Sequence, residues 1–264
     1  MCEIFCFNSN KPKQVNECLE CFYNHSDEHP HGWGLANLKS DEFVIEKEPV
    51  KASCSTHLRE ILSNPIIGKN VFAHIRLATV GEIISPNCHP FIRADDSSRS
   101  WMLIHNGTIF DYPELEKYRE YEKGDTDSER ILLYIIDRVN QFEKDKGALS
   151  TIRERFNLLS EIIADMSKDN KLNLMISDGD MTYIHSNMDG SLYYLINDDG
   201  ILIASTPVND DENWLKVEMN KLFGLIDGQI VFESEPHQNE FIFTEKHEKI
   251  MEECLKSINS DLDD

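Results

Sequence analysis

Short apolar runs recur along the chain and predict a protein built mainly of β-strands. Several runs follow one another with only a turn signal between them, such as SerAspGlyAsp at 177–180 and AsnAspAspGly at 197–200. Such short connections favour antiparallel meanders. The predicted strands cover residues 2–8, 33–38, 42–47, 70–77, 101–105, 172–177, 181–186, 192–196, 201–205 and 229–233.

Two segments between the strands show the period of amphipathic helices instead. One apolar stripe contains Ile131, Leu132, Ile135, Ile136 and Val139; the other contains Ile152, Phe156, Leu159, Ile163 and Met166. Many strands are apolar on both faces, so neither face can lie in water and helices must cover the sheets. We therefore predict an α+β fold, a four-layer αββα sandwich of two antiparallel sheets.

The length and composition favour one domain. The chain has 264 residues, of which 40% are hydrophobic, and shows neither a repeat nor a low-complexity linker. We expect a single domain over residues 2–264, with Met1 removed and residues 259–264 forming a solvated acidic tail.

Charge and cysteine usage limit the partners and the compartment. The net charge is −22, which disfavours nucleic acid, anionic membranes and polyanionic substrates. Seven cysteines, an odd number, without a signal-peptide pattern fit reduced thiols in the cytoplasm. The longest apolar runs are too short to span a bilayer, which takes about 20 residues.

Cys2 directly follows the initiator methionine, at the start of the run MCEIFCFNSN. Removal of Met1 would leave a thiol and a free α-amine on one residue, a nucleophile with its own base. The apolar run behind it predicts a buried strand that holds the terminus in place. A small buried core cysteine is the alternative interpretation.

Four further stretches carry polar groups in apolar surroundings: HisProHisGlyTrpGly at 29–34, AlaHisIleArgLeuAlaThrValGly at 73–81, HisAsnGlyThrIle at 105–109 and GlyAspThrAspSerGlu at 124–129. Each has a structural alternative. Strand alternation puts His74 and Arg76 on one face, where a salt bridge is as reasonable as a ligand contact. AsnGly after an apolar strand is typical of a hairpin turn. Thr126 and Glu129 predict a capping box, and a carboxylate in the first turn of that helix also suits the helix dipole.

Together with Cys2, this ordered set resembles the glutaminase domain of the class II glutamine amidotransferases, which are N-terminal nucleophile hydrolases. The resemblance covers most of the chain, includes AsnCysHisPro at 87–90 and agrees with SerThrPro at 205–207. It is closest to stand-alone, YafJ-type members, because the similarity extends over a chain without a following synthase domain. It implies an Ntn-hydrolase-like fold, no cofactor and no metal.

The resemblance also implies roles for individual residues. Cys2 would be the nucleophile, with its own α-amine as base. Asn106 and Gly107 would form the oxyanion hole. The substrate-binding residues would be Arg76 for the α-carboxylate, Asp127 for the α-ammonium and Thr79 in support of the carboxylate end. His74, His89 and His105 match family positions near the site, and we expect them to act as scaffolding.

The expected reaction is cleavage of the γ-glutamyl amide of glutamine or a γ-glutamyl compound through a Cys2 thioester, releasing glutamate and ammonia or an amine. Leu77 and Val80 replace the tryptophan and histidine common in synthase-linked members, so ammonia channelling is not expected. The leaving group and an acceptor or synthase partner chain stay open.

Two other functions compete with this interpretation. Cys18 and Cys21, followed by His29 and His31, have the spacing of a zinc site, although the two cysteines also fit an amphipathic helical stripe. The second competitor is a catalytically silent γ-glutamyl-binding or regulatory subunit of the same fold.

Overall fold

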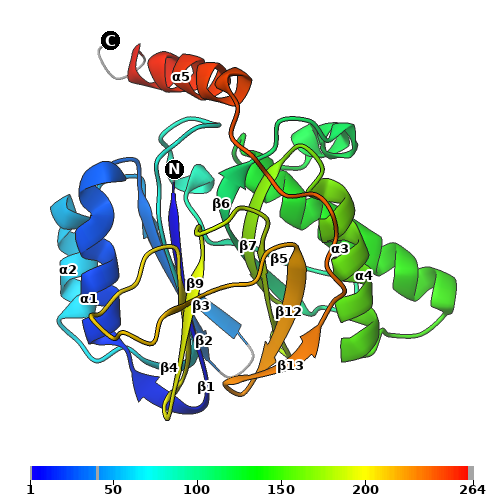
Figure 1. Ribbon diagram of the computed structural model, residues 1–264, viewed down its shortest axis with the longest axis horizontal. Coiled ribbons are helices and arrows are strands. Elements are labelled where there is room, and N and C mark those ends of the chain that lie inside the picture. Colours follow the sequence, from blue (N-terminus) through cyan, green and yellow to red (C-terminus); the bar gives the residue numbers. More distant parts are fainter. Residues whose placement is uncertain (1, 40–41, 261–264) are drawn as a thin grey trace.

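Two antiparallel sheets pack face to face and carry helices on their outer faces, which gives four layers (Figure 1). This computed structural model describes residues 2–39 and 42–260. The predicted αββα sandwich is confirmed. Met1 lies outside the described residues, and the predicted acidic tail falls partly on the last helix and otherwise outside them.

The first sheet has seven strands in the order β11-β9-β10-β1-β4-β2-β3. Its central strand, β1, lies between β10 and β4, with Phe5 opposite both Ala204 and Ala73. The strands are β1 (Glu3–Gln14), β2 (Trp33–Lys39), β3 (Glu42–Glu48), β4 (Ile67–Ile75), β9 (Tyr193–Asn197), β10 (Gly200–Ala204) and β11 (Leu215–Lys216).

The second sheet has six strands in the order β13-β12-β8-β7-β6-β5. Its strands are β5 (Phe91–Ala94), β6 (Ser100–Thr108), β7 (Lys171–Ser177), β8 (Thr182–Ser186), β12 (Lys221–Ile226) and β13 (Gln229–Glu233). All ten predicted strand regions contain a strand of the structure, whereas β5, β11 and β12 were not predicted.

The helices form the outer layers. The elements are α1 (Asn16–Asn24), α2 (Thr56–Leu62), α3 (Asp127–Lys146), α4 (Ile152–Met166), α5 (Glu245–Ser260) and the short 3-10 helices η1 (His25–Glu28), η2 (Ala52–Cys54), η3 (Ser85–Asn87) and η4 (Pro113–Glu120). α1 and α2 pack on the first sheet, and α3 and α4 on the second. Both predicted helical stripes are confirmed in α3 and α4.

Strand alternation divides the apolar residues into three cores. On β1, Phe5 and Phe7 face the helices, whereas Ile4 and Cys6 face the second sheet. The layer between the sheets also receives Met102 from β6. Because β1 is covered on both sides, both of its faces must be apolar, as its sequence predicts.

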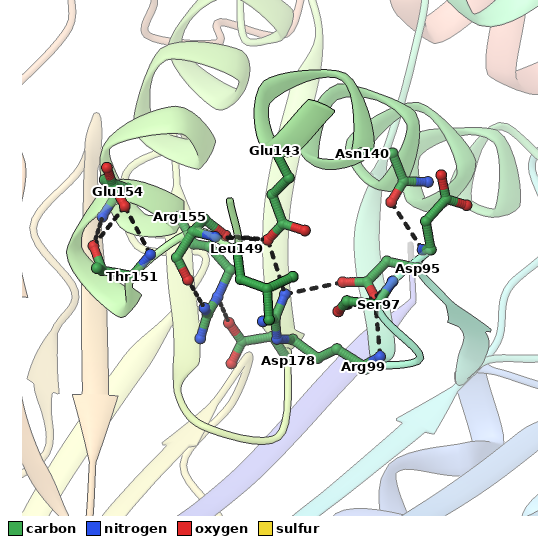
Figure 2. A network of polar contacts seen from close by, with 12 residues as sticks. Asp95, Ser97, Arg99, Asn140, Glu143, Leu149, Thr151, Glu154, Arg155 and Asp178 are labelled. Carbon is green, nitrogen blue, oxygen red and sulfur yellow. Dashed lines mark hydrogen bonds and ion pairs between the residues drawn. The ribbon is translucent and has the colours of Figure 1, made fainter. Parts of the chain in front are cut away.

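A buried polar network joins α3, α4 and the second sheet at the end of α3 (Figure 2). The Arg155 Nε donates to Asp178 Oδ2 at 2.6 Å, and its Nη1 donates to the Ser150 carbonyl at 2.8 Å. Glu143 accepts from the Ser150 N–H at 3.0 Å. Gly147 ends α3 with a φ of 73°, a conformation that favours glycine. The network fixes the helical layer on the sheet that carries β6 and β7.

Two local predictions were wrong. Asn106 and Gly107 lie within β6, opposite Asn173 and Leu172 of β7, and do not form a hairpin turn. Thr126 caps α3 by accepting from the Glu129 N–H, but the Glu129 carboxylate accepts from the N–H groups of Lys123 and Gly124 instead of completing a capping box.

Candidate active site

Cys2 lies immediately before β1 and borders a pocket of about 350 Å³. Its side chain is half-buried, and its Sγ donates to the Leu77 carbonyl at 3.4 Å. Alternation along β1 continues the inward-facing series Cys6, Ile4 to Cys2, so the thiol faces the second sheet. The pocket is lined by Cys2, Glu3, Glu28, His29, Leu77, Asn106, Lys171, Met188, Asp189, Gly190, Ser191, Ser205 and Thr206.

Asn106 reaches the same pocket from the second sheet. It continues the inward-facing series Met102, Ile104 of β6. Its Nδ2 donates to the Ser205 Oγ at 3.1 Å, and the same oxygen accepts from the Ile4 N–H at 3.1 Å. The Ser205 hydroxyl therefore connects the strand behind Cys2 with the strand that carries Asn106.

Gly107 occupies a position in β6 where no side chain fits. A Cβ there would collide with the Lys171 carbonyl and with the His105 ring. Leu172 lies opposite Gly107 on β7, and both of its main-chain polar groups point toward β8. Its N–H donates to the Asn187 Oδ1 at 2.8 Å, and its carbonyl oxygen accepts from the His185 Nδ1 at 2.7 Å. Antiparallel geometry then makes Gly107 and Leu172 a non-hydrogen-bonded pair, with the Gly107 N–H directed away from β7.

Arg76 follows β4, is 3% exposed, and binds the loop that comes after it. Its Nη1 donates to the Glu82 carbonyl at 2.8 Å, and its Nη2 donates to the carbonyls of Val80 at 2.9 Å and Gly81 at 3.1 Å. Among the described residues, Arg76 forms no salt bridge with a carboxylate, and it does not line the Cys2 pocket. Its forked end holds the 80–82 loop.

Thr79 and Asp127 meet the end of β6 just beyond Gly107. The Thr79 Oγ1 lies 3.3 Å from the Thr108 Oγ1. One Asp127 carboxylate oxygen accepts from the Ile109 N–H at 2.9 Å, and the other accepts from the Ser128 N–H at 2.8 Å. The structure thus brings Asn106, Gly107, Thr79 and Asp127 to one strand end.

The three histidines of the predicted scaffold are buried. His74 lies between the sheets, with its Nε2 3.3 Å from the His105 carbonyl and its ring stacked on His89 at 4.0 Å. His105 contacts the Ser128 Oγ at 3.0 Å through its Nδ1. Burial lowers the pKa of His105 and holds the pKa values of His74 and His89 well below the usual range. All three are therefore neutral near pH 7.

A family model described as "Glutamine amidotransferases class-II" matches residues 1–199. The chain belongs to this family. It is 28% identical over 261 residues to the uncharacterized protein MJ1515 of Methanocaldococcus jannaschii, covering 88% of this chain and 71% of that protein. It is 25% identical over 249 residues to YafJ of Escherichia coli, named as a candidate glutamine amidotransferase, covering 82% of this chain and 94% of YafJ.

Solved structures of class II glutamine amidotransferases share the fold. A predicted glutamine amidotransferase from Pseudomonas aeruginosa superposes with a TM-score of 0.63 at 20% identity, covering 87% of this chain and 99% of that one. The glutamine phosphoribosylpyrophosphate amidotransferase of Bacillus subtilis also gives a TM-score of 0.63, at 17% identity, with 91% of this chain and 50% of that one covered.

The sequence analysis assigned no role to two residues that line the Cys2 pocket, Lys171 and Ser205. Lys171 is only 1% exposed, and its Nζ lies 3.3 Å from the Asn106 Oδ1. Burial lowers its pKa to about 8. Burial raises the pKa of the Cys2 thiol, and the nearby positive charges of Arg76 and Lys171 oppose that change. A lysine flanking an apolar strand is normally solvated, so no pattern in the sequence indicates this placement.

The structure does not support the zinc interpretation. Within residues 2–39 and 42–260, no three His, Cys, Asp or Glu side chains gather in a way that could hold a metal ion. The His29 Nδ1 contacts the His25 carbonyl at 2.8 Å, the His31 Nδ1 accepts from the Ala78 N–H at 2.9 Å, and Cys21 is exposed on α1. In the same described ranges, every helix is too short or too polar to cross a membrane.

Proposed function

We propose that this protein is an N-terminal cysteine amidohydrolase that cleaves the γ-glutamyl amide bond of glutamine or a γ-glutamyl compound. The observation that carries the proposal is the shared pocket of Cys2 and Asn106, which come from facing sheets. The Ser205 hydroxyl links the Asn106 amide to the Ile4 N–H of the strand that follows Cys2. A nucleophile and an oxyanion donor on one pocket are the minimum that acyl transfer requires.

The proposed reaction begins after Met1 is removed. The Cys2 α-amine, with a reference pKa of about 7.7–8.0, accepts the thiol proton as sulfur attacks the γ-carbonyl carbon. The Asn106 Nδ2 and the Gly107 N–H stabilise the oxyanion. Collapse breaks the carbon–nitrogen bond, and the α-ammonium returns the proton to the departing ammonia or amine. Water then attacks the thioester, giving glutamate and the free thiol.

We further propose that Arg76 and Asp127 bind the charged head of the substrate, with Thr79 in support. Arg76 now donates to three loop carbonyls, so a substrate α-carboxylate would replace some of these contacts in the bidentate geometry that guanidinium favours. Asp127 keeps lone pairs beyond its two main-chain contacts for an α-ammonium. Binding would then couple to rearrangement of the 80–82 loop.

The proposal places the enzyme in the cytoplasm as a single domain acting on a small molecule. All seven cysteines are free thiols, which suits a reducing compartment. The net charge of −22 argues against nucleic acid as a partner.

The decisive experiment varies Cys2 and its amine separately. Cys2→Ala should abolish glutamate release from a panel of γ-glutamyl compounds, and retention of Met1 or an uncleavable N-terminal tag should do the same with the thiol present. Cys6→Ala is the matched control, because Cys6 is a buried cysteine of β1, the strand that follows Cys2, and its side chain lies in the apolar core. It should lower stability and leave turnover within about twofold.

Mass spectrometry should find the native chain starting at Cys2. A tagged protein that keeps more than about a tenth of native turnover, with the tag intact, would contradict the proposal. A native protein that binds but never hydrolyses these compounds would instead identify the silent subunit.

A further inference from the structure

We propose that Lys171 is a positioning residue of this active site, which fixes the orientation of the Asn106 amide and stabilises the Cys2 thiolate. The inference rests on the proposed function and adds a residue to it.

Lys171 begins β7 and faces the layer between the two sheets. Along β7, Leu172 and Leu174 pack against the outer helices, whereas Met175 packs between the sheets. Alternation therefore places Lys171 on the inner face with Met175. Cys2 and Asn106 lie on inner faces by the same alternation, and all three side chains border the pocket.

The contact between Lys171 and Asn106 selects one of two orientations of the amide. The ammonium can only donate, so the atom 3.3 Å from it is the amide oxygen Oδ1. The amide NH2 group then points to the other side, where it donates to Ser205. Without the ammonium, a rotation of the amide by half a turn would present Oδ1 to the developing oxyanion and repel it.

The positive charge of Lys171 has a second consequence, which concerns Cys2. A lysine that is 1% exposed loses most of its hydration, and its charged form persists only where neighbouring groups compensate. A thiolate at Cys2 is such a group. Within the described ranges, the other ionisable side chains on the pocket wall are Glu3, Glu28, His29 and Asp189. Arg76, His105 and Cys88 interact electrostatically with Cys2 or Lys171.

Several of these groups are already engaged elsewhere. Glu3 pairs with His25 at 2.9 Å, Asp189 pairs with Lys216 at 2.9 Å, and Arg76 holds its loop. Lys171 is thus the cation that borders both the thiol and the amide within the part of the chain that the structure describes.

Two variants separate the two effects. Lys171→Met keeps the length of the side chain and removes both donor and charge, whereas Lys171→Gln keeps a donor for Asn106 and removes the charge. The rate of Cys2 alkylation by iodoacetamide, followed on the Cys2 peptide by mass spectrometry, reports the thiol pKa without any substrate. Steady-state glutamate release reports kcat and KM.

Both variants should raise the pH midpoint of Cys2 alkylation by about one unit, as expected when a neighbouring positive charge is lost. Lys171→Met should lower kcat at least about tenfold with KM within threefold, and Lys171→Gln should recover part of kcat. Lys47→Met is the matched control, because Lys47 also has a burial-lowered pKa but donates to the Cys88 and Pro90 carbonyls. It should leave the midpoint unchanged.

An unchanged alkylation midpoint, or a kcat within twofold of wild type in a folded Lys171→Met protein, would overturn the inference. If the wild-type protein releases glutamate from none of the compounds tested, the proposed function fails, while the alkylation profile still decides whether Lys171 acts on Cys2. Thermal unfolding of each variant identifies any loss of fold.

Discussion

Replacing Asn106 with alanine tests the proposed oxyanion hole most directly, because its expected effects on turnover and on stability can be measured separately. Asn106 is 4% exposed and makes two side-chain hydrogen bonds, one to the Ser205 hydroxyl and one from the Lys171 ammonium. Removing one oxyanion donor costs about 2.7–4 kcal/mol of transition-state stabilisation, which is about a 100- to 1000-fold loss in kcat. KM should stay within about threefold, since the donor is needed chiefly when charge develops on the carbonyl oxygen.

The same substitution should also lower stability. A buried ammonium that loses a neutral acceptor costs about 1–3 kcal/mol, which urea unfolding can resolve. Asn8→Ala is the matched control. Asn8 is a 2% exposed asparagine of β1 whose amide also makes several hydrogen bonds, to Asn70, Thr182 and Gly228, away from the Cys2 pocket. This control should lose similar stability and keep its kcat.

Asn106→Asp tests the side-chain charge at position 106 while the side-chain volume stays the same. The carboxylate would preserve the side-chain volume and pair with Lys171, so stability should stay closer to wild type. Its negative charge would oppose the oxyanion, so kcat should fall at least as far as in Asn106→Ala. If KM rises while kcat stays intact, or if Asn8→Ala lowers kcat equally, Asn106 is a ground-state or structural residue and the reasoning fails.

Two further predictions concern substrate recognition and acid stability. Arg76→Lys and Asp127→Asn should each lower kcat/KM, mainly through KM, because losing one partner of a desolvated charge pair costs about 2–5 kcal/mol; an effect below threefold would remove these residues from substrate binding. Burial lowers the pKa of His185 to about 3, so the folded protein holds this ring neutral while the unfolded chain protonates near pH 6.5. Between about pH 6.5 and pH 3 the unfolded chain binds a proton at His185 that the folded protein does not. The free energy of unfolding therefore falls as the pH is lowered through this window, by up to about 1.4 kcal/mol per pH unit, and is unaffected by His185 above about pH 6.5. His185→Gln should flatten the pH dependence of urea unfolding in that window, and an unchanged slope would contradict the assignment.

The strands that the sequence predicts are those whose own composition specifies them. The apolar residues of β1 and β7 require burial whatever their neighbours are. By contrast, β5 has four residues, β11 has two, and Gly224 interrupts β12, so their pairing depends on adjacent strands more than on their own pattern. The AsnGly pair shows the opposite error, because a strong local turn signal was overruled by the ladder between β6 and β7.

The candidate site divides in the same way. Cys2, Asn106, Gly107, Arg76, Thr79 and Asp127 were predicted from ordered motifs, and the structure gathers most of them at one end of β6. Lys171 belongs to no such motif, and Ser205 was noted only within SerThrPro at 205–207, with no role assigned. Lys171 lies near Cys2 only because the two sheets pack face to face, and Ser205 lies near it only because β10 pairs with β1. Both relations join distant segments, which local sequence does not encode.

The placement of Cys2 at the start of β1 follows from the same packing. β1 is hydrogen-bonded on both edges, to β10 and β4, and covered on both faces, so its first residues are held as firmly as its middle. Alternation then decides which way the thiol points, and a shift of one residue would turn Cys2 toward the helices and Glu3 toward Asn106. The register that pairs Phe5 with Ala204 also brings Ser205 beside the Ile4 N–H, where its hydroxyl reaches Asn106. One ladder therefore determines both the direction of the Cys2 thiol and the position of the Ser205 hydroxyl that connects β1 to the opposite sheet, so the beginning of this central strand can hold a reactive side chain in a fixed direction.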